Sequence, residues 1–188
     1  MTSKKSAIKI LRAGGIGVLP TDTLYGLVGR ALDKAAVERI YKVRRRRPDK
    51  PLIILIGDLA DLKLFGIKLA DFEKEFLSRY WPGAVSVVLP CRSAKFKYLH
   101  RGTKTLAFRW PNKKSVQEIL RQTGPLVAPS ANPEGEKSAD NLAEARAYFD
   151  DRVDFYYGRG SLAGALSTLV KLADGRVEVL RTGAVKIK

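Results

Sequence analysis

The chain has 188 residues, 45% of them hydrophobic and 29% charged, which suits one domain with a single core. One cysteine (Cys91) and one histidine (His100) exclude a disulfide framework and a cysteine-based zinc site. Thirty-five Lys and Arg against 19 Asp and Glu give a net charge of +16, which predicts attraction to polyanions such as RNA, nucleotides or an anionic membrane surface.

The N-terminal segment is basic, but MTSKKSAIKI lacks the apolar core of a signal peptide. No later segment reaches membrane-spanning length, so we expect a cytoplasmic protein without a membrane partner. Ile8 and Leu11 have helical spacing, and Gly14-Gly15 is a common helix ending. The following IGVLP is typical of a short buried strand that leads into TDTLYGLV.

A second helix is predicted over residues 34–43, with Asp33 placed to cap its N-terminus. A run of four arginines, residues 44–47, follows at the C-terminal end, where cations meet the negative end of the helix dipole. Pro48 and Pro51 prevent the helix from continuing. The apolar residues of the helix fall on one side: Val37, Ile40, Tyr41 and Val43.

The rest of the chain alternates strands and helices up to its last third. The expected strands are LIILI, VSVVLP, TLAFR and the short PLV, and the expected helices cover residues 70–80, 113–124 and 138–149. The tail segments STLVKL, RVEVL and AVKI have alternating apolar residues that suit short antiparallel strands. This order predicts an α/β fold, a single domain over residues 1–188 whose twisted, mixed parallel and antiparallel sheet is flanked by helices.

Hydroxyl, amide and basic side chains follow several of the predicted strands, where open α/β sheets usually bind ligands. They are Thr21 and Thr23 in PTDTLYGL, Thr105 and Arg109 in TLAFR, Ser130 and Asn132 in APSAN, and Ser167 and Thr168 in GALSTLV. Each also has a structural interpretation. Thr21 and Asp22 can form a turn, residues 130–132 can cap a helix, and Arg109 can pair with an acidic neighbour. His100 is interpreted as structural.

Taken together, these stretches resemble the YrdC/TsaC family of threonylcarbamoyl-AMP synthases. The resemblance rests on PTDTLYGL, KPL, WPG and APSAN, which occur in the family's order and spacing, and it extends to STLVKLADGRVEVLRTGAV. It spans almost the whole chain and matches the short, single-domain form, without the additional C-terminal domain of longer relatives. The expected fold is therefore YrdC-like.

The resemblance implies a nucleotidyltransferase that joins L-threonine, bicarbonate and ATP into threonylcarbamoyl-adenylate and pyrophosphate. A downstream transferase complex then moves the threonylcarbamoyl group to tRNA, which the basic surface of this protein could also bind. Magnesium is expected on the triphosphate, held largely by phosphate and water. Adenylyl transfer to a carbamate needs positioning and charge neutralisation more than a protein nucleophile.

The resemblance also implies which residues bind the substrates. For L-threonine they are Thr23, Arg109, Ser130 and Ser167, with Arg109 paired to the carboxylate. For ATP they are Arg44, Arg46, Lys50, Thr105, Ala128, Asn132, Ser138 and Arg181. Two positions depart from the family pattern. The usual lysine of a Lys-x-Arg pair falls on Arg44, unless Lys42 replaces it, and a position that is histidine in some relatives is Leu55.

Two other functions stay open at this point: an RNA-binding module without catalysis, and a carbamoyl-adenylate-forming domain like that of hydrogenase maturation proteins.

The arginine run is expected to be divided. Arg44 and Arg46 should face the ATP phosphates, and Arg45 and Arg47 should be solvated, because neighbouring residues at a helix end point about 100° apart. Alternate residues share a side where the chain leaves the helix and becomes extended.

Overall fold

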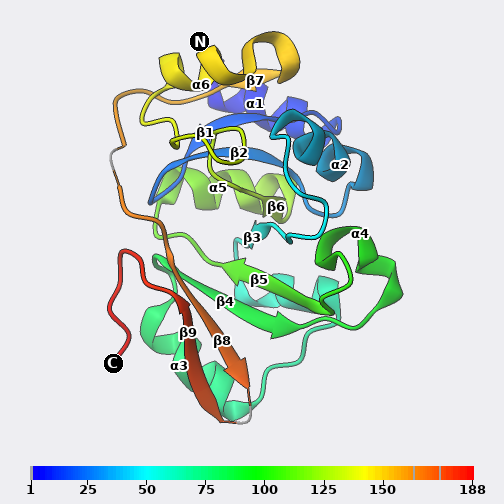
Figure 1. Cartoon of the computed structure of the whole chain (residues 1–188), viewed down its shortest axis with the longest axis vertical. Coiled ribbons are helices and arrows are strands. Elements are labelled where there is room, and N and C mark those ends of the chain that lie inside the picture. The colour runs from blue at the N-terminus through cyan, green and yellow to red at the C-terminus, as the bar shows by residue number, and fades with distance from the viewer. Residues whose placement is uncertain (1, 163, 174) are drawn as a thin grey trace.

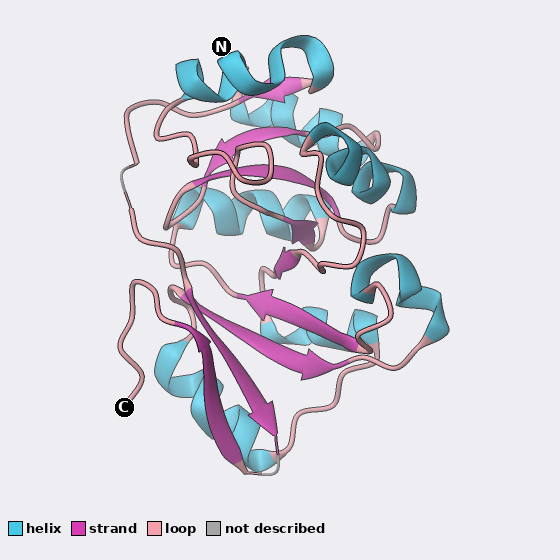
Figure 2. Ribbon diagram, viewed as in Figure 1, coloured by secondary structure: helices cyan, strands magenta, loops and turns pink. Residues whose placement is uncertain are grey.

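The protein folds as one mixed sheet with helices on both of its faces (Figures 1 and 2). The structure is a computed structural model that describes residues 2–162, 164–173 and 175–188. Within these ranges the strand order is β7-β1-β2-β6-β3-β5-β4-β8-β9. The strands are β1 (Gly17–Pro20), β2 (Tyr25–Arg30), β3 (Ile53–Leu55), β4 (Val85–Pro90), β5 (Thr105–Arg109), β6 (Leu126–Val127), β7 (Phe155–Tyr156), β8 (Thr168–Ala173) and β9 (Arg176–Arg181).

The sheet contains both parallel and antiparallel neighbours, which confirms the predicted fold class. β1 with β7, β3 with β5 and β4 with β8 are parallel, whereas the other neighbouring pairs are antiparallel. The main helices are α1 (Lys4–Arg12), α2 (Lys34–Val43), α3 (Asp71–Tyr80), α4 (Lys97–His100), α5 (Lys114–Thr123) and α6 (Leu142–Phe149). Short 3₁₀ helices cover Leu59–Phe65, Ala94–Phe96 and Asp150–Arg152.

Side-chain alternation along the strands divides the core into two clusters. Leu27 of β2 and Ile54 of β3 belong to the larger cluster, which contains buried residues of α2, α3 and α6. Their neighbours Val28 and Leu55 point to the opposite face and join the smaller cluster with α1 and α5. The helices α1 and α5 therefore cover one face of the sheet near β2, β6 and β3, and that face continues beyond them over β5, β4 and β8.

The helix α2 forms as the sequence predicts. The Asp33 carboxylate accepts a hydrogen bond from the Ala36 N–H at 3.1 Å, which satisfies one of the free donors at the helix start. Gly124 likewise ends α5, as expected for a residue with φ +77°. These local signals mark the start of α2 and the end of α5 before any tertiary contact is considered.

The C-terminal tail agrees with the prediction in part. STLVKL and RVEVL form the antiparallel hairpin β8–β9, but AVKI (residues 184–187) is not a strand. Its backbone instead returns to the start of β8, where the Ala184 N–H donates to the Leu166 carbonyl at 2.8 Å and the Val185 N–H donates to Thr168 Oγ1 at 3.1 Å. Gly183 permits this close approach, because a Cβ there would collide with the Leu166 carbonyl oxygen.

No helix within the described ranges combines the length and the apolar character needed to cross a membrane. The N-terminal helix α1 packs against α5, with Ala7, Ile8 and Leu11 buried between that helix and the sheet. Its apolar side thus belongs to the core of this domain.

Candidate active site

A pocket of about 360 Å³ lies on the sheet face that α1 and α5 leave open, and we call it the central pocket. Its floor follows from strand register. Ala107 and Arg109 of β5 are the partners of Ile53 and Leu55 of β3, so they point to the same face. Thr105 is two residues before Ala107 and therefore points to the same face, and Val88 of β4 is opposite Ala107. Leu106 and Phe108 point the other way, into the core.

Arg109 stands at the end of this floor and is held by two neighbours. Its Nη1 donates to Thr23 Oγ1 at 2.9 Å, and its Nη2 lies 3.2 Å from Asp22 Oδ1. The Arg109 and Asp22 side chains are only 5% and 8% exposed, so this is a buried ion pair. Asp22 is fixed in turn because its Oδ2 accepts a hydrogen bond from the Asn112 N–H at 3.0 Å. The acidic neighbour allowed by the structural interpretation of Arg109 is thus present.

The surroundings of Arg109 lower the pKa of its guanidinium. Burial lowers the pKa of its guanidinium, the Asp22 carboxylate opposes that shift, and nearby Arg181 adds to it. Arginine stays protonated despite such shifts because its ordinary pKa is so high. Its Nε has no hydrogen-bond partner among the residues that the structure describes. The floor therefore ends in a fixed cation that retains unused donor capacity.

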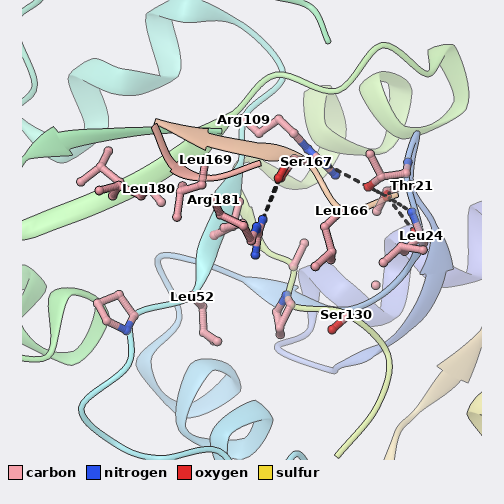
Figure 3. Close-up of a pocket in the computed structure, with 18 of the residues that line it drawn as sticks. Thr21, Leu24, Leu52, Arg109, Ser130, Leu166, Ser167, Leu169, Leu180 and Arg181 are labelled. Atoms are coloured by element: carbon pink, nitrogen blue, oxygen red, sulfur yellow. Dashed lines mark hydrogen bonds between the residues drawn. The ribbon is translucent and has the colours of Figure 1, made fainter. Parts of the chain in front are cut away.

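Ser167 and Arg181 form the next part of the pocket wall (Figure 3). Arg181 Nη2 donates to the Ser167 carbonyl at 2.9 Å and to its Oγ at 3.3 Å. Ser167 Oγ also shares a hydrogen bond of 2.8 Å with Ser86 Oγ, which is completely buried in β4. The Ser167 hydroxyl is thereby oriented from two sides. Sequence reasoning missed Ser86, although its position in β4, two residues before Val88, places it on the pocket face.

Arg44 joins the arginine run to the APSAN loop. Its side chain is buried, and its Nε donates to the Asn132 carbonyl at 2.8 Å. Its Nη2 lies 3.3 Å from Ser130 Oγ and 3.4 Å from Asn132 Oδ1. Burial lowers the pKa of Arg44 to about 10, with a further contribution from Arg46. No helix starts at residues 130–132, so the interpretation of these residues as a helix cap is wrong.

The arginine run is divided as predicted, but for a different reason. Arg44 and Arg46 line the central pocket, whereas Arg45 and Arg47 are exposed. The chain is not extended here. Arg45 has φ +51°, and the N–H groups of Arg45 and Arg46 donate to the carbonyls of Lys42 and Tyr41. This pair of bonds is a Schellman motif with Arg45 as its left-handed residue, and Arg44 and Arg46 on either side of it both reach the pocket.

Nine of the twelve residues predicted to bind substrate line the central pocket. They are Thr23, Arg44, Arg46, Thr105, Ala128, Arg109, Ser130, Ser167 and Arg181. Lys50, Asn132 and Ser138 stand outside it. Asn132 and Ser138 support the APSAN loop, since Asn132 Nδ2 donates to the Pro133 and Glu136 carbonyls and Ser138 Oγ lies 3.4 Å from Asn132 Oδ1.

Lys50 is exposed, and its Nζ lies 2.9 Å from Glu134 Oε1. Glu134 was not singled out from the sequence, because nothing local indicates a contact across 84 residues. Asp22 was considered only as a turn residue for the same reason, since its partner Arg109 is distant in sequence. Both acidic residues contact cations that were predicted to bind substrate.

Two departures from the family pattern can now be located. Lys42 is exposed on α2 and does not line the central pocket, whereas Arg44 does, so the replacement of the family lysine by Arg44 stays a prediction. Leu55 is completely buried in the cluster with α1 and α5 and does not line the pocket described here. His100 also lies outside the lining, buried, with its Nδ1 accepting a hydrogen bond from the Gly102 N–H at 3.1 Å.

The sequence is similar to curated proteins over nearly its whole length. It is 32% identical over 182 residues to the threonylcarbamoyl-AMP synthase of Bacillus subtilis, covering 95% of this chain and 53% of that protein. It is 30% identical to the threonylcarbamoyl-AMP synthase of Chromobacterium violaceum, covering 93% of this chain and 91% of that protein. The chain thus spans about half of the Bacillus relative and most of the Chromobacterium one.

The fold has solved counterparts as well. The crystal structure of Pyrococcus abyssi Sua5 complexed with L-threonine superposes with a TM-score of 0.89 at 28% identity, covering 97% of this chain and 55% of that one. The Sua5/YciO/YrdC family model, which carries the description "telomere recombination", matches residues 9–183. The chain therefore belongs to the Sua5/YciO/YrdC family.

Proposed function

We propose that this protein is an L-threonylcarbamoyladenylate synthase, a nucleotidyltransferase that converts L-threonine, bicarbonate and ATP into threonylcarbamoyl-AMP and pyrophosphate. The product would supply a complex that modifies tRNA with the threonylcarbamoyl group. The observation that carries the proposal is the central pocket, where a buried arginine and three hydroxyls meet a second group of cations. The relatives named as synthases and the Sua5 complex with L-threonine support the same assignment.

Arg109 is the proposed partner of the threonine carboxylate. Its guanidinium is held in place by Thr23 and Asp22, and it retains unused donors. A planar guanidinium that is already oriented can bind a carboxylate with two parallel hydrogen bonds at little additional entropy cost. The hydroxyls of Thr23, Ser130 and Ser167 line the same pocket and would bind the remaining polar groups of threonine.

The ATP phosphates are assigned to Arg44, Arg46 and Lys50, and the base to the apolar part of the pocket mouth. Leu166 and Leu180 are 42% and 46% exposed although they are large and apolar, which suits contact with a planar ring. The carbamate oxygen would then attack the α-phosphorus and displace pyrophosphate. Cations beside the leaving group stabilise its charge, and this contribution dominates phosphoryl and adenylyl transfer.

Magnesium would neutralise the triphosphate in this reaction. Among the described residues, no group of three or more His, Cys, Asp or Glu side chains gathers into a metal site. The carboxylates that contact the arginine run, Glu134 and Asp49, are engaged by cations. We assign no protein ligand to the ion, and magnesium bound chiefly through phosphate and water requires few.

The deciding experiment is pyrophosphate release from ATP and bicarbonate with and without L-threonine. Threonine-dependent release supports the synthase. Release that ignores threonine indicates a carbamoyl-adenylate-forming domain instead, and no release together with tRNA binding indicates a non-catalytic RNA-binding module. L-Serine is a useful companion substrate, because it keeps the carboxylate and hydroxyl of threonine but lacks its methyl group.

A further inference from the structure

Glu134 occupies an anion site that the protein builds from the arginine run. Its Oε2 accepts a hydrogen bond from the Arg47 backbone N–H at 2.6 Å. Its Oε1 lies 2.9 Å from Lys50 Nζ and 3.8 Å from Arg46 Nη1. One carboxylate is thus bound by a backbone donor, an ammonium and a guanidinium. Such a combination of donors suits phosphate oxygens equally well.

The Arg46 guanidinium of this site is oriented independently of Glu134. Arg46 Nε donates to the Lys50 carbonyl at 3.2 Å, and its Nη2 donates to the Pro51 carbonyl at 3.1 Å. The Tyr41 hydroxyl also donates to the Lys50 carbonyl, at 2.8 Å. The Arg46 guanidinium would therefore stay in place without the carboxylate, and the Arg47 N–H is fixed by the backbone, so two of the three donors do not depend on Glu134.

The anion site adjoins the central pocket through Arg46, which belongs to both. A polyphosphate chain that starts inside the pocket would pass Arg46 and meet Lys50 beyond it. Glu134 stands in that path with its negative charge directed at both cations. Because a carboxylate and a phosphate repel each other at such distances, the two anions would not share these cations without a loss of affinity.

We propose that Glu134 is an internal counter-ion that the nucleotide's polyphosphate displaces from Lys50 and Arg46, so that this residue limits how tightly the protein binds polyphosphate. The inference rests on the proposed function, since it takes the nucleotide to be the ligand of these cations. It assigns to Glu134 a role in setting nucleotide affinity.

Displacement requires only the side chain to move. The backbone of residue 134 is attached firmly, because its N–H donates to the Arg44 carbonyl at 2.8 Å. The side chain is 22% exposed, and the adjoining residues 135–137 are exposed to solvent. A rotation of the carboxylate toward water would free the Arg47 N–H, Lys50 and Arg46 together.

Protonation does not provide an alternative way to release Glu134. The Arg47 N–H and the Lys50 ammonium lower the pKa of this carboxyl from 4.5 to about 2. Because the folded-state pKa is lowered, the contacts of Glu134 stabilise the fold above pH 4.5 and are lost only as the pH falls toward 2. Near neutral pH the carboxylate is fully charged, and a competing anion has to displace it.

The test compares Glu134→Gln with wild type in calorimetric titrations with inorganic tripolyphosphate and with ATP, each without and with magnesium. Glutamine keeps an oxygen for the Arg47 N–H but removes the charge. We expect the variant to bind both ligands about five- to thirtyfold more tightly at low salt, because the charge repulsion between Glu134 and the polyphosphate is removed. Glu136→Gln is the matched control, since this exposed residue is two positions away, and it should stay within about twofold of wild type.

Unchanged or weaker binding of metal-free tripolyphosphate by Glu134→Gln would overturn the inference. Weaker binding in the presence of magnesium alone would also overturn it, because Glu134 would then be a ligand of the metal. Failure of the proposed function gives a different result: tighter tripolyphosphate binding by the variant without threonine-dependent pyrophosphate release in either protein. That result leaves the competition at Lys50 and Arg46 intact and removes the assignment to a synthase.

Discussion

Two groups of cations border the central pocket, and they differ in what surrounds them. Arg109 is buried with Asp22. Lys50 Nζ and Arg46 Nη1 instead contact Glu134 near the solvent. Each group already has an acidic partner in the folded protein. The buried pair belongs to the folded core, because removing one partner would leave the other charge buried with neither a counter-ion nor water. The exposed group can exchange its partner, because water solvates whichever anion is released.

This difference suits the two substrates proposed above. A small amino acid carboxylate needs one oriented guanidinium in a site shielded from water, where each hydrogen bond contributes more. A triphosphate brings several charges of its own and needs cations it can reach from solvent. If this comparison is correct, substitutions at the buried end should affect folding and threonine together, and substitutions at the exposed end should affect nucleotide binding with little effect on folding.

The largest expected effect is that of Arg109→Ala. It leaves Asp22 buried without its partner, which should lower the free energy of unfolding by about 3–5 kcal/mol. Threonine affinity should fall about tenfold to a hundredfold through loss of a charge-assisted hydrogen bond, and ATP affinity much less. Urea unfolding and calorimetry measure the two effects.

The double variant Asp22→Asn/Arg109→Ala separates those effects, because removing both charges should restore part of the stability but none of the threonine binding. An equal loss of threonine and ATP affinity in Arg109→Ala would indicate that the arginine supports the whole pocket and has no special relation to the amino acid.

A smaller effect is expected at the exposed end. Arg46→Ala should raise the ATP Michaelis constant about tenfold and change stability little, because its side chain bonds carbonyls near the surface. Arg44→Ala should raise the constant less but destabilise the protein by about 1–3 kcal/mol, since the Asn132 carbonyl loses its buried donor. Steady-state kinetics and urea unfolding distinguish the two arginines.

Arg45→Ala and Arg47→Ala are the controls in the same run, and both should leave ATP kinetics nearly unchanged. If either proves the most damaging of the four, the assignment of the phosphate contacts has the wrong register. If all four are mild and equal, the run is a solvated basic patch.

Salt offers a test that needs no substitution. Ionic screening shortens the range of exposed charges from about 10 Å at 0.1 M to about 3 Å at 1 M and affects buried pairs far less. Tripolyphosphate affinity should therefore fall steeply between low and high salt, while threonine affinity should change by less than about twofold. A threonine affinity as sensitive to salt as that of tripolyphosphate would contradict the contrast between the two ends.

Much of the fold could be predicted because its signals are local. Asp33 at the start of α2, Gly124 at the end of α5 and the alternation in TLAFR each act within a few residues. The AVKI segment has the same alternation as a strand, yet its backbone bonds go to Leu166 and Thr168. A periodic pattern predicts which residues are buried, but it does not say whether a neighbouring strand is available.

The candidate site could be predicted only as far as motifs mark it. The family pattern pointed to Arg109 and Ser167. Their contacts with Asp22 and Ser86 join residues more than 80 positions apart, so the sequence gives no local sign of them. Glu134 could not be found for the same reason. The exposure of Arg45 and Arg47 was predicted correctly, whereas the phosphate contacts of Arg44 and Arg46 stay a prediction, and the backbone turns through a left-handed residue and does not become extended.

That left-handed residue leads to the smallest predicted effect. Arg45 has φ +51° at the position after the helix end, where glycine is favoured because a side chain costs about 1 kcal/mol in this conformation. Glycine also loses more chain entropy on folding, which offsets part of the gain. We expect Arg45→Gly to be more stable than Arg45→Ala by about 0.5 kcal/mol, with ATP kinetics unchanged in both.

The alanine variant is the matched control, because it removes the same exposed side chain but keeps a Cβ. Urea midpoints give the comparison, and a glycine variant no more stable than alanine would mean that the turn after α2 does not hold Arg45 in the left-handed region. Arg46 and Arg44 would then owe their common direction to their own contacts with the Pro51 and Asn132 carbonyls rather than to the turn.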